Sequence, residues 1–506
     1  MSTQTEMGNV PNIPPGEFLG HPKALWQLSN IEMWERFAYY GMRALLAVYV
    51  ATTFFSHMGD NANAEASLVY GGYTALVYAT GIIGGYIADH VLGYQRSILL
   101  GAIIMAAGLF VLLIEDLDWF LVGLALIVAG NGLFKPNIST MIGKLYAPGD
   151  IRRDSGFTIF YMGINLGALI APLITAAWIG ATWGLKYGFL AAGIGMILST
   201  LFLEVAKKSL GHIGLPQEGK EGWGRFFAVG AGAIVMAGAV FFLLSESTIL
   251  GYLLVGIMIA LAAYFIIAGI RSGDKVQLQR YIAMLILFVA NACFWALFEQ
   301  AGSSMNFFAR EFVTPMYGSM DTWQSGGFAI FQSLNPLYIL LFAPLFAAMW
   351  PWLEKRNINP SIPRKFALGL IQVALGFYVL VFAIGNMQNA AGLVPWIFMA
   401  FCYLLHTTGE LCLSPIGLSM VTKLAAEKET GMAMGGWFLS IAMAQYVAGI
   451  IAAIASGGGG AHGVVEGAGI GQYAETYMML FWIGLGFGIA YLVVAPLINK
   501  LMHGVK

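Results

Sequence analysis

The chain consists of long apolar runs separated by short polar stretches. A helix of about 20 apolar residues spans the hydrocarbon core of a bilayer. Fourteen runs reach that length, so the pattern predicts an all-α membrane protein with fourteen transmembrane helices. We expect them near residues 31–55, 68–88, 97–114, 119–142, 157–179, 187–205, 226–244, 249–270, 280–301, 328–350, 366–385, 394–421, 432–455 and 477–499.

Two polar joints divide these helices into groups of six, two and six. The longest interruption covers residues 206–224, and a second, basic joint covers 271–280. We therefore expect a six-helix bundle in 1–206, a linker with two extra helices in 207–279, and a second six-helix bundle in 280–506. Two six-helix halves around a central site are a transporter architecture. The extra pair carries no evident chemistry, and we interpret it as a structural or lipid-facing insertion.

The composition agrees with a multi-span protein and argues against an enzyme. Residues are 59% hydrophobic and 10% charged, whereas soluble domains are about 25% charged. The three cysteines lie in apolar runs without metal-ligand spacing, and we find no nucleophile elbow and no HExxH motif. We expect no catalytic residue, no metal, no other cofactor and no nucleic-acid partner. The glycine-rich stretch 456–463 is expected to be a flexible outer loop rather than a phosphate-binding loop.

Basic residues predict the orientation, because Lys and Arg concentrate in cytoplasmic loops. Of the 25 Lys and Arg residues, three lie within expected spans and two, Lys186 and Arg310, lie in one alternate set of loops. The other twenty lie at the termini or in the opposite set of loops. Both termini are therefore expected in the cytoplasm, with no cleaved signal peptide. The protein is expected in the cell inner membrane.

The stretch 31–43, IEMWERFAYYGMR, places charges on one stripe of the first span. Its polar residues fall in an arc of roughly 140° at about 100° per residue. They are Glu32, Glu35, Arg36, Tyr39, Tyr40 and Arg43. Charged groups at membrane depth usually face a bundle interior or a wet cavity. This stripe is the first candidate wall of a site.

Further polar residues interrupt other apolar spans. The main ones are Tyr78, Lys135, Asn165, Glu299, Gln300, Gln332, Asn335, Glu410, Trp437 and Ser440. For an amide such as Asn165 or Asn335, a hydrogen bond that merely fixes packing is an equally good interpretation. Lys135 and Glu410 favour function more strongly, since a charge at depth needs a partner or a purpose.

The intramembrane charges sum to −1. The cations are Arg36, Arg43 and Lys135, and the acids are Glu32, Glu35, Glu299 and Glu410. The acids and arginines of 31–43 balance one another, so the excess appears only when the later spans are added. One proton would neutralise the set, which motivates the hypothesis of proton-coupled transport. With cations in the first half and Glu410 in the second, the cavity suits a zwitterionic cargo.

Several motifs together resemble the proton-coupled oligopeptide transporter (POT or PTR) family of the major facilitator superfamily. They are ExxERFxYYGMR at 32–43, GGYIADHVLG at 84–93, GLFKPNIS at 132–139, FTIFYMGINLGALIAP at 157–172, FWALFEQAGSS at 294–304 and GELCLSP at 409–415. The resemblance runs from about residue 20 to the last span. Bacterial members commonly carry two extra helices between the halves.

The resemblance implies uptake of di- and tripeptides with protons by alternating access. It assigns Glu32, Glu35, Arg36 and Glu299 to proton coupling. It assigns the peptide carboxylate to Arg43 and Lys135 and the amino group to Glu410. Tyr40, Tyr78, Asn165, Asn335 and Trp437 would line the pocket, and we add Ser440 of the same span as Trp437 as a further candidate for binding.

One position departs from the mammalian-type members. Where they carry a histidine in the second helix, this chain has Gly71, so coupling should rest on carboxylates. We expect a monomeric proton/peptide symporter in the bilayer. The alternatives are a same-fold symporter of another small solute such as nitrate, or a channel or receptor that does not cycle.

Overall fold

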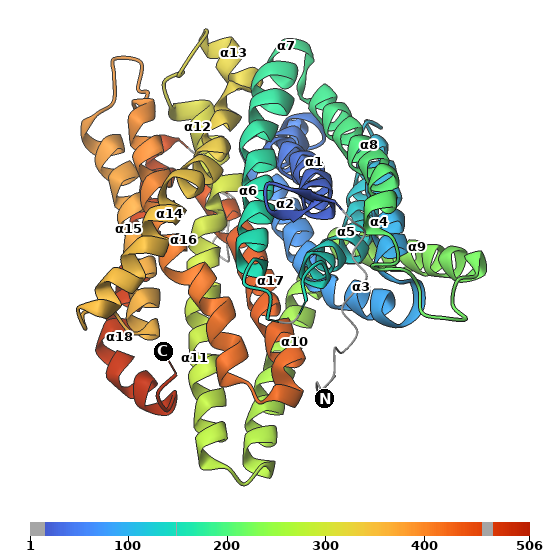
Figure 1. Cartoon of the computed structure of the whole chain (residues 1–506). Helices are drawn as coiled ribbons and strands as arrows, with labels where there is room; N and C mark the ends of the chain where they lie inside the picture. The colour runs from blue at the N-terminus through green and yellow to red at the C-terminus, as the bar shows by residue number, and fades with distance from the viewer. Residues whose placement is uncertain (1–15, 148, 458–468, 506) are drawn as a thin grey trace, which may run out of the picture.

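The computed structural model describes residues 16–147, 149–457 and 469–505, and these are helical almost throughout (Figure 1). Residues 458–463 of the expected glycine-rich loop lie outside the described residues. The first part of the chain forms β1 (Glu17–Phe18), β2 (His21–Pro22), α1 (Lys23–Thr53), η1 (Ser56–Asn61), α2 (Ala62–Ala79), α3 (Gly81–Ile87), η2 (Ala88–Leu92), α4 (Tyr94–Val111), α5 (Leu117–Lys144), α6 (Arg153–Pro172), η3 (Leu173–Gly180), α7 (Ala181–Trp183) and α8 (Leu185–Leu210).

The second part begins with two long helices and continues with a second group. These elements are α9 (Trp223–Ser245), α10 (Ser247–Arg271), α11 (Lys275–Phe298), η4 (Glu299–Gly302), α12 (Ser304–Phe312), α13 (Met320–Ser325), η5 (Gly327–Ser333), α14 (Leu334–Lys355), α15 (Ile362–Asn386), α16 (Trp396–Leu424), η6 (Glu427–Glu429), α17 (Thr430–Ala455) and α18 (Ile470–Leu501). We call α1 to α8 the first bundle and α11 to α18 the second bundle.

The fourteen expected spans are all present as long helices. Among the described residues, thirteen helical segments are long and apolar enough to cross a membrane. The fourteenth is α1, with 31 residues. Its charged stripe lowers its hydropathy, yet most of its length is buried against α6 and α8. This arrangement confirms the all-α major facilitator fold.

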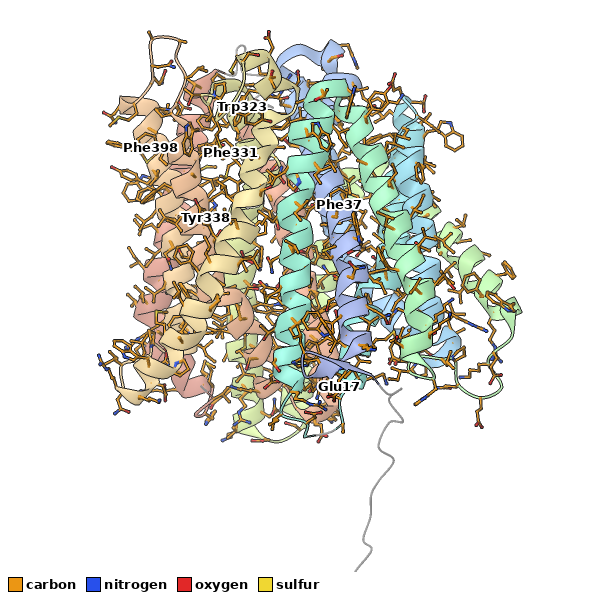
Figure 2. All side chains as sticks on the ribbon, turned by 45° about the horizontal axis from the view of Figure 1, so that its top comes forward. Glu17, Phe37, Trp323, Phe331, Tyr338 and Phe398 are labelled. Atoms are coloured by element: carbon orange, nitrogen blue, oxygen red, sulfur yellow. The ribbon has the colours of Figure 1, made fainter. Side chains whose placement is uncertain are left out.

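The inserted pair joins the two bundles at the edge of the molecule. α9 packs against α5, whereas α10 packs against α11 and α17. Figures 1 and 2 show α9 at the periphery. In the apolar 18-residue stretch of each helix, only 22% of the residues are buried inside the protein. Both helices thus present broad apolar faces. Helix ends at Leu210 and Arg271 lie close to the expected boundaries at 206 and 279, and the division into three units stays a prediction.

Breaks in helix geometry occur beside the polar residues at membrane depth. Pro136 directly follows Lys135 inside α5, and Pro415 lies inside α16 beyond Glu410. Proline removes a backbone hydrogen bond, and membrane helices accept it where neighbours satisfy the freed groups. The span that begins with α11 changes to a 3₁₀ turn at Glu299. Such turns within a helix often mark functional hinges.

The two bundles are bonded to each other in the half away from the termini. Figure 2 places Glu17, near the start of the described chain, at one end of the molecule, which we call the termini end, and Trp323 and Phe331 at the opposite end. In that opposite half the Asn306 amide donates to the Ala44 carbonyl over 3.0 Å. The Ser333 hydroxyl donates to the Leu169 carbonyl over 2.8 Å. The bundles are therefore held together at the end opposite the termini.

Candidate functional site

The stripe on α1 forms a buried cluster around one arginine. Arg36 Nε lies 3.1 Å from Glu32 Oε1, and Arg36 Nη2 donates to Glu35 Oε1 over 2.7 Å. All three residues are at most 3% exposed. Asn131 Nδ2 of α5 lies 3.4 Å from Glu35 Oε1 and donates to it. The cluster carries one more negative charge than positive, and Glu32 Oε2 is buried without a hydrogen-bond partner among the residues that the structure describes.

Arg43 is paired across the bundle interface rather than on its own helix. Its guanidinium forms an ion pair with Glu299, the first residue of η4. Its Nε also donates to the Tyr70 hydroxyl on α2 over 2.5 Å. The Arg43 side chain is 11% exposed and that of Glu299 is 2% exposed. Although α1 carries two acids and two arginines, both acids lie beside Arg36, and Arg43 pairs with an acid of the second bundle.

Lys135 has a different environment from the two arginines. Its ammonium lies 4.7 Å from the centre of the Tyr78 ring, a cation–π distance. Among the described residues it forms no ion pair, although Glu32 is near enough to interact with its charge. The side chain is half-buried. Lys135 is therefore held against an aromatic ring rather than by a carboxylate.

Glu410 is the corresponding charge in the second bundle. The Asn335 amide donates to Glu410 Oε2 over 2.8 Å and to the Thr407 hydroxyl over 3.1 Å. Tyr40 and Tyr161 of the first bundle lie near enough to interact with its charge. Glu410 is half-buried and has no cationic partner among the described side chains. Opposite unpaired charges thus stand on the two bundles.

Some aromatic and amide residues of the expected pocket lie beside the charged groups, whereas others pack inside one bundle. The centre of the Tyr40 ring lies 5.8 Å from the Arg43 guanidinium carbon, and both residues belong to α1. Asn165 is buried and donates to the Tyr161 carbonyl over 2.9 Å, within its own helix. Tyr40 and Tyr78, like Asn335, stand beside the charged groups.

Trp437 and Ser440 lie apart from this set, inside the packing of the second bundle. Ser440 is fully buried, accepts from Asn291 over 2.8 Å and donates to the Trp437 carbonyl. The Trp437 ring is 2% exposed and packs against Phe288. Their assignment to the pocket stays a prediction.

The structure adds residues that the pattern of charges did not single out. Tyr70 lies two helical turns before Tyr78, and Asn131 one turn before Lys135, so both share a helix face with an identified residue. That spacing was the available signal. Gly71 packs so closely against α17 that a Cβ would lie 2.7 Å from the Gly449 Cα. A histidine has no room there in this arrangement.

Comparisons with known proteins agree on one family. Residues 95–465 match the PTR2 profile of the POT family. The peptide transporter YePEPT of Yersinia enterocolitica is 37% identical, over 87% of this chain and 89% of its own length. The dipeptide and tripeptide permease B of Edwardsiella piscicida is 33% identical, over 97% and 98% respectively.

Solved structures agree as well. A crystal structure of a peptide transporter POT in complex with sulfate is 36% identical, has a TM-score of 0.79, and is matched over 97% of this chain and 98% of its own. A variant in complex with alafosfalin gives a TM-score of 0.81 at 36% identity and the same coverage. The chain therefore belongs to the POT family of the major facilitator superfamily, and it is a transporter rather than an enzyme.

Proposed function

We propose that the protein imports di- and tripeptides together with protons by alternating access. The observation that carries the proposal is the pair of opposite charges, Lys135 and Glu410, on different bundles and without ion partners among the described residues. A zwitterionic peptide satisfies both at once, with its carboxylate toward Lys135 and its amino group toward Glu410. Relatives named as dipeptide and tripeptide permeases support this substrate class.

The proton acts, in this proposal, through carboxylates at the interface. Glu299 holds Arg43 while it is ionised. Protonation of Glu299 removes one charge from the pair and releases the Arg43 guanidinium, which can then bind the peptide carboxylate in the bidentate manner that arginine favours. Glu32, Glu35 and Arg36 form a second buried group whose net charge of −1 would be neutralised by one proton. Proton uptake is thereby linked to cargo binding and to the contact between bundles.

Alternating access requires that the bonds away from the termini break and form again. Asn306, Ser333 and Glu299 all bond across the interface there. We place both termini in the cytoplasm, following the distribution of Lys and Arg, so these bonds close the outer side. The protein then works as a monomer in the inner membrane, since each chain holds both halves of the site.

The test is uptake of a labelled dipeptide into proteoliposomes, with and without an inward proton gradient. We expect accumulation only with the gradient, and counterflow of labelled dipeptide without it. A channel gives no counterflow and a receptor gives no flux. Gradient-driven uptake of nitrate without uptake of any peptide would replace the proposal by the alternative substrate.

A further inference from the structure

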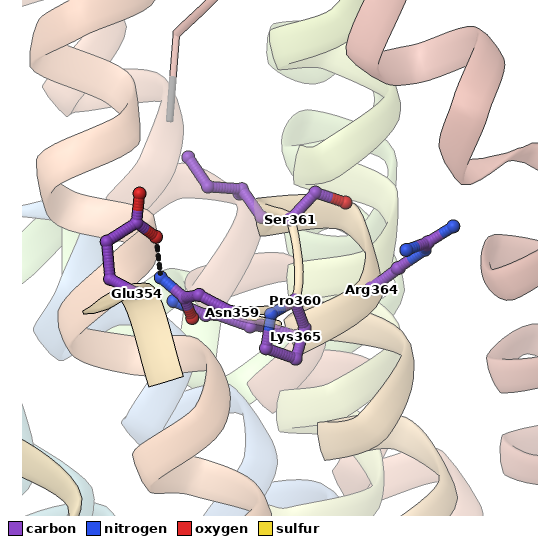
Figure 3. Close-up of a pocket in the computed structure, with 7 residues that line it drawn as sticks. Glu354, Asn359, Pro360, Ser361, Arg364 and Lys365 are labelled. Atoms are coloured by element: carbon purple, nitrogen blue, oxygen red, sulfur yellow. Dashed lines mark hydrogen bonds between the residues drawn. The ribbon is translucent and has the colours of Figure 1, made fainter. Parts of the chain in front are cut away.

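A pocket of about 160 Å³ opens where α14 passes into α15. It is lined by Glu354 at the end of α14, by the connecting residues 359–361 and by the first turn of α15 (Figure 3). The Asn499 amide, near the end of α18, donates to the Ser361 hydroxyl over 2.9 Å. The pocket therefore lies at the termini end, away from the charges between the bundles.

Lys365 is the unusual residue of this pocket. It is 8% exposed and lines the pocket. Among the described residues its ammonium has no hydrogen bond and no ion pair, and its contact is the Trp350 ring, 4.2 Å away. Glu354, which lines the same pocket, is near enough to interact with this charge but forms no direct ion pair with it. A buried ammonium without a hydrogen-bonded anionic partner is unfavourable, and a cation–π contact offsets only part of that cost. The side chain is thus available to an anion in the pocket.

The start of α15 points to the same kind of ligand. This helix is 25 residues long, and no side chain caps its first turn. The Ser361 hydroxyl, which precedes the helix, accepts a hydrogen bond from Asn499 instead. Pro363 has no N–H, and the Lys365 N–H donates to the Ser361 carbonyl over 2.9 Å, so among the described residues the N–H groups of Ile362 and Arg364 are left in this turn. Such N–H groups and the helix dipole make a helix N-terminus favourable for phosphate and other anions. An ammonium and a helix N-terminus therefore meet at one small pocket.

The surroundings match the level of lipid headgroups. Residues 354–365 contain four basic side chains and one acidic one, and the acidic one, Glu354, accepts a hydrogen bond from Asn359 over 2.9 Å (Figure 3). Leu341 and Leu345 are exposed on α14, and Trp352 is the last exposed large apolar side chain of that helix, with exposed Ile358 following in the connection to α15. Tryptophan marks the membrane–water boundary, and basic pockets there bind lipid phosphates.

We propose that this pocket binds a phosphate group, held by Lys365 and the N-terminus of α15. In the bilayer, the source of this group is the headgroup of an anionic phospholipid. Binding there stabilises the joint between α14, which leads up to Asn335 at the central site, and α15.

The experiment measures the thermal unfolding midpoint of the full chain in nanodiscs at constant ionic strength. Discs of phosphatidylcholine are compared with discs that also contain phosphatidylglycerol. We expect phosphatidylglycerol to raise the midpoint of the wild type and to lose that effect in K365Q. R356Q is the matched control: Arg356 stacks on Trp352 at 3.9 Å and does not line the pocket, so it should keep the wild-type shift.

A second arm titrates inorganic phosphate in phosphatidylcholine discs. A saturable rise in the wild type that is absent in K365Q identifies free phosphate as a further source of the same group. If K365Q does not fold, R364Q removes the other cation that lines the pocket and should reduce the shift, since the positive charge offered to the phosphate is then smaller. The proposal is overturned if neither phosphatidylglycerol nor inorganic phosphate raises the unfolding midpoint of the wild type, or if K365Q shows the same rise as the wild type. It is also overturned if R356Q loses as much of the rise as K365Q does.

Discussion

Arg43 of the first bundle is ion-paired with Glu299 of the second, and both side chains are largely shielded from solvent. Glu299 begins a 3₁₀ turn in the span formed by α11 and α12, so the contact lies where that span is least regular. Tyr70 fixes the other side of the guanidinium. In the proposed mechanism the single carboxylate of Glu299 joins the two bundles, and a proton on it breaks the contact. The proposed coupling is therefore open to single substitutions.

Glu299→Gln should abolish gradient-driven uptake and leave counterflow. Glutamine cannot change its charge, so the proton no longer controls the release of Arg43. Breaking a buried pair costs about 3–5 kcal/mol, which should also loosen the closed end. The measurement is dipeptide uptake and counterflow in proteoliposomes. Glu311→Gln is the control, because Glu311 also bonds across the interface, accepting from the Asn63 amide over 3.1 Å. Gradient-driven uptake at the wild-type rate by Glu299→Gln would contradict the assignment of Glu299 to proton coupling.

Glu410→Gln should weaken binding of zwitterionic dipeptides selectively. Losing one partner of a buried charge pair costs about 2–5 kcal/mol, or roughly 30-fold or more in affinity. The hydrogen bond from Asn335 can persist to glutamine, so the fold should be kept. Affinities are compared for a dipeptide and its N-acetylated form, which lacks the ammonium. Glu475→Gln, an exposed carboxylate on α18, is the control. Equal losses for both peptides would remove Glu410 from amine recognition.

Lys135→Gln should show the complementary selectivity. The substitution removes the unpaired ammonium, so a peptide with a free carboxylate loses affinity, while its C-terminal amide changes little. A loss of about tenfold corresponds to 1.4 kcal/mol. Lys186→Gln serves as control, since Lys186 pairs with Glu115 in an exposed loop contact of 2.9 Å. Unchanged affinity for the free carboxylate in Lys135→Gln would contradict this role.

The sequence predicted which residues are polar at depth better than it predicted how they pair. Helical periodicity places Glu32, Glu35 and Arg36 on one stripe, and they do form one cluster. The partner of Arg43 lies 256 residues away, and only tertiary packing of α1 beside η4 decides that contact. Periodicity on a single helix carries no such information.

The sequence also does not determine which neighbours Trp437 and Ser440 meet. The sequence shows a polar residue in an apolar span, but it does not show which neighbour that span turns it toward. Here the serine meets Asn291 inside the second bundle. The local sequence pattern thus locates membrane helices and their charged stripes, whereas the direction in which an isolated hydroxyl points depends on how several helices pack.

Two adjacent glycines in the GGYIADHVLG motif allow a test of close packing between α3 and α5. A Cβ on Gly84 would lie 1.7 Å from the Gly132 carbonyl oxygen, whereas one on Gly85 meets no atom within 4 Å. Gly84→Ala forces backbone against backbone, so it should cost about 1–3 kcal/mol or more. Gly85→Ala should be neutral or stabilise by up to about 1 kcal/mol, because alanine is the better helix former. Unfolding midpoints of the two purified variants in one detergent measure the difference. Equal midpoints would show that α3 can move away from α5 without loss, and the close contact would then not hold this pair of helices together.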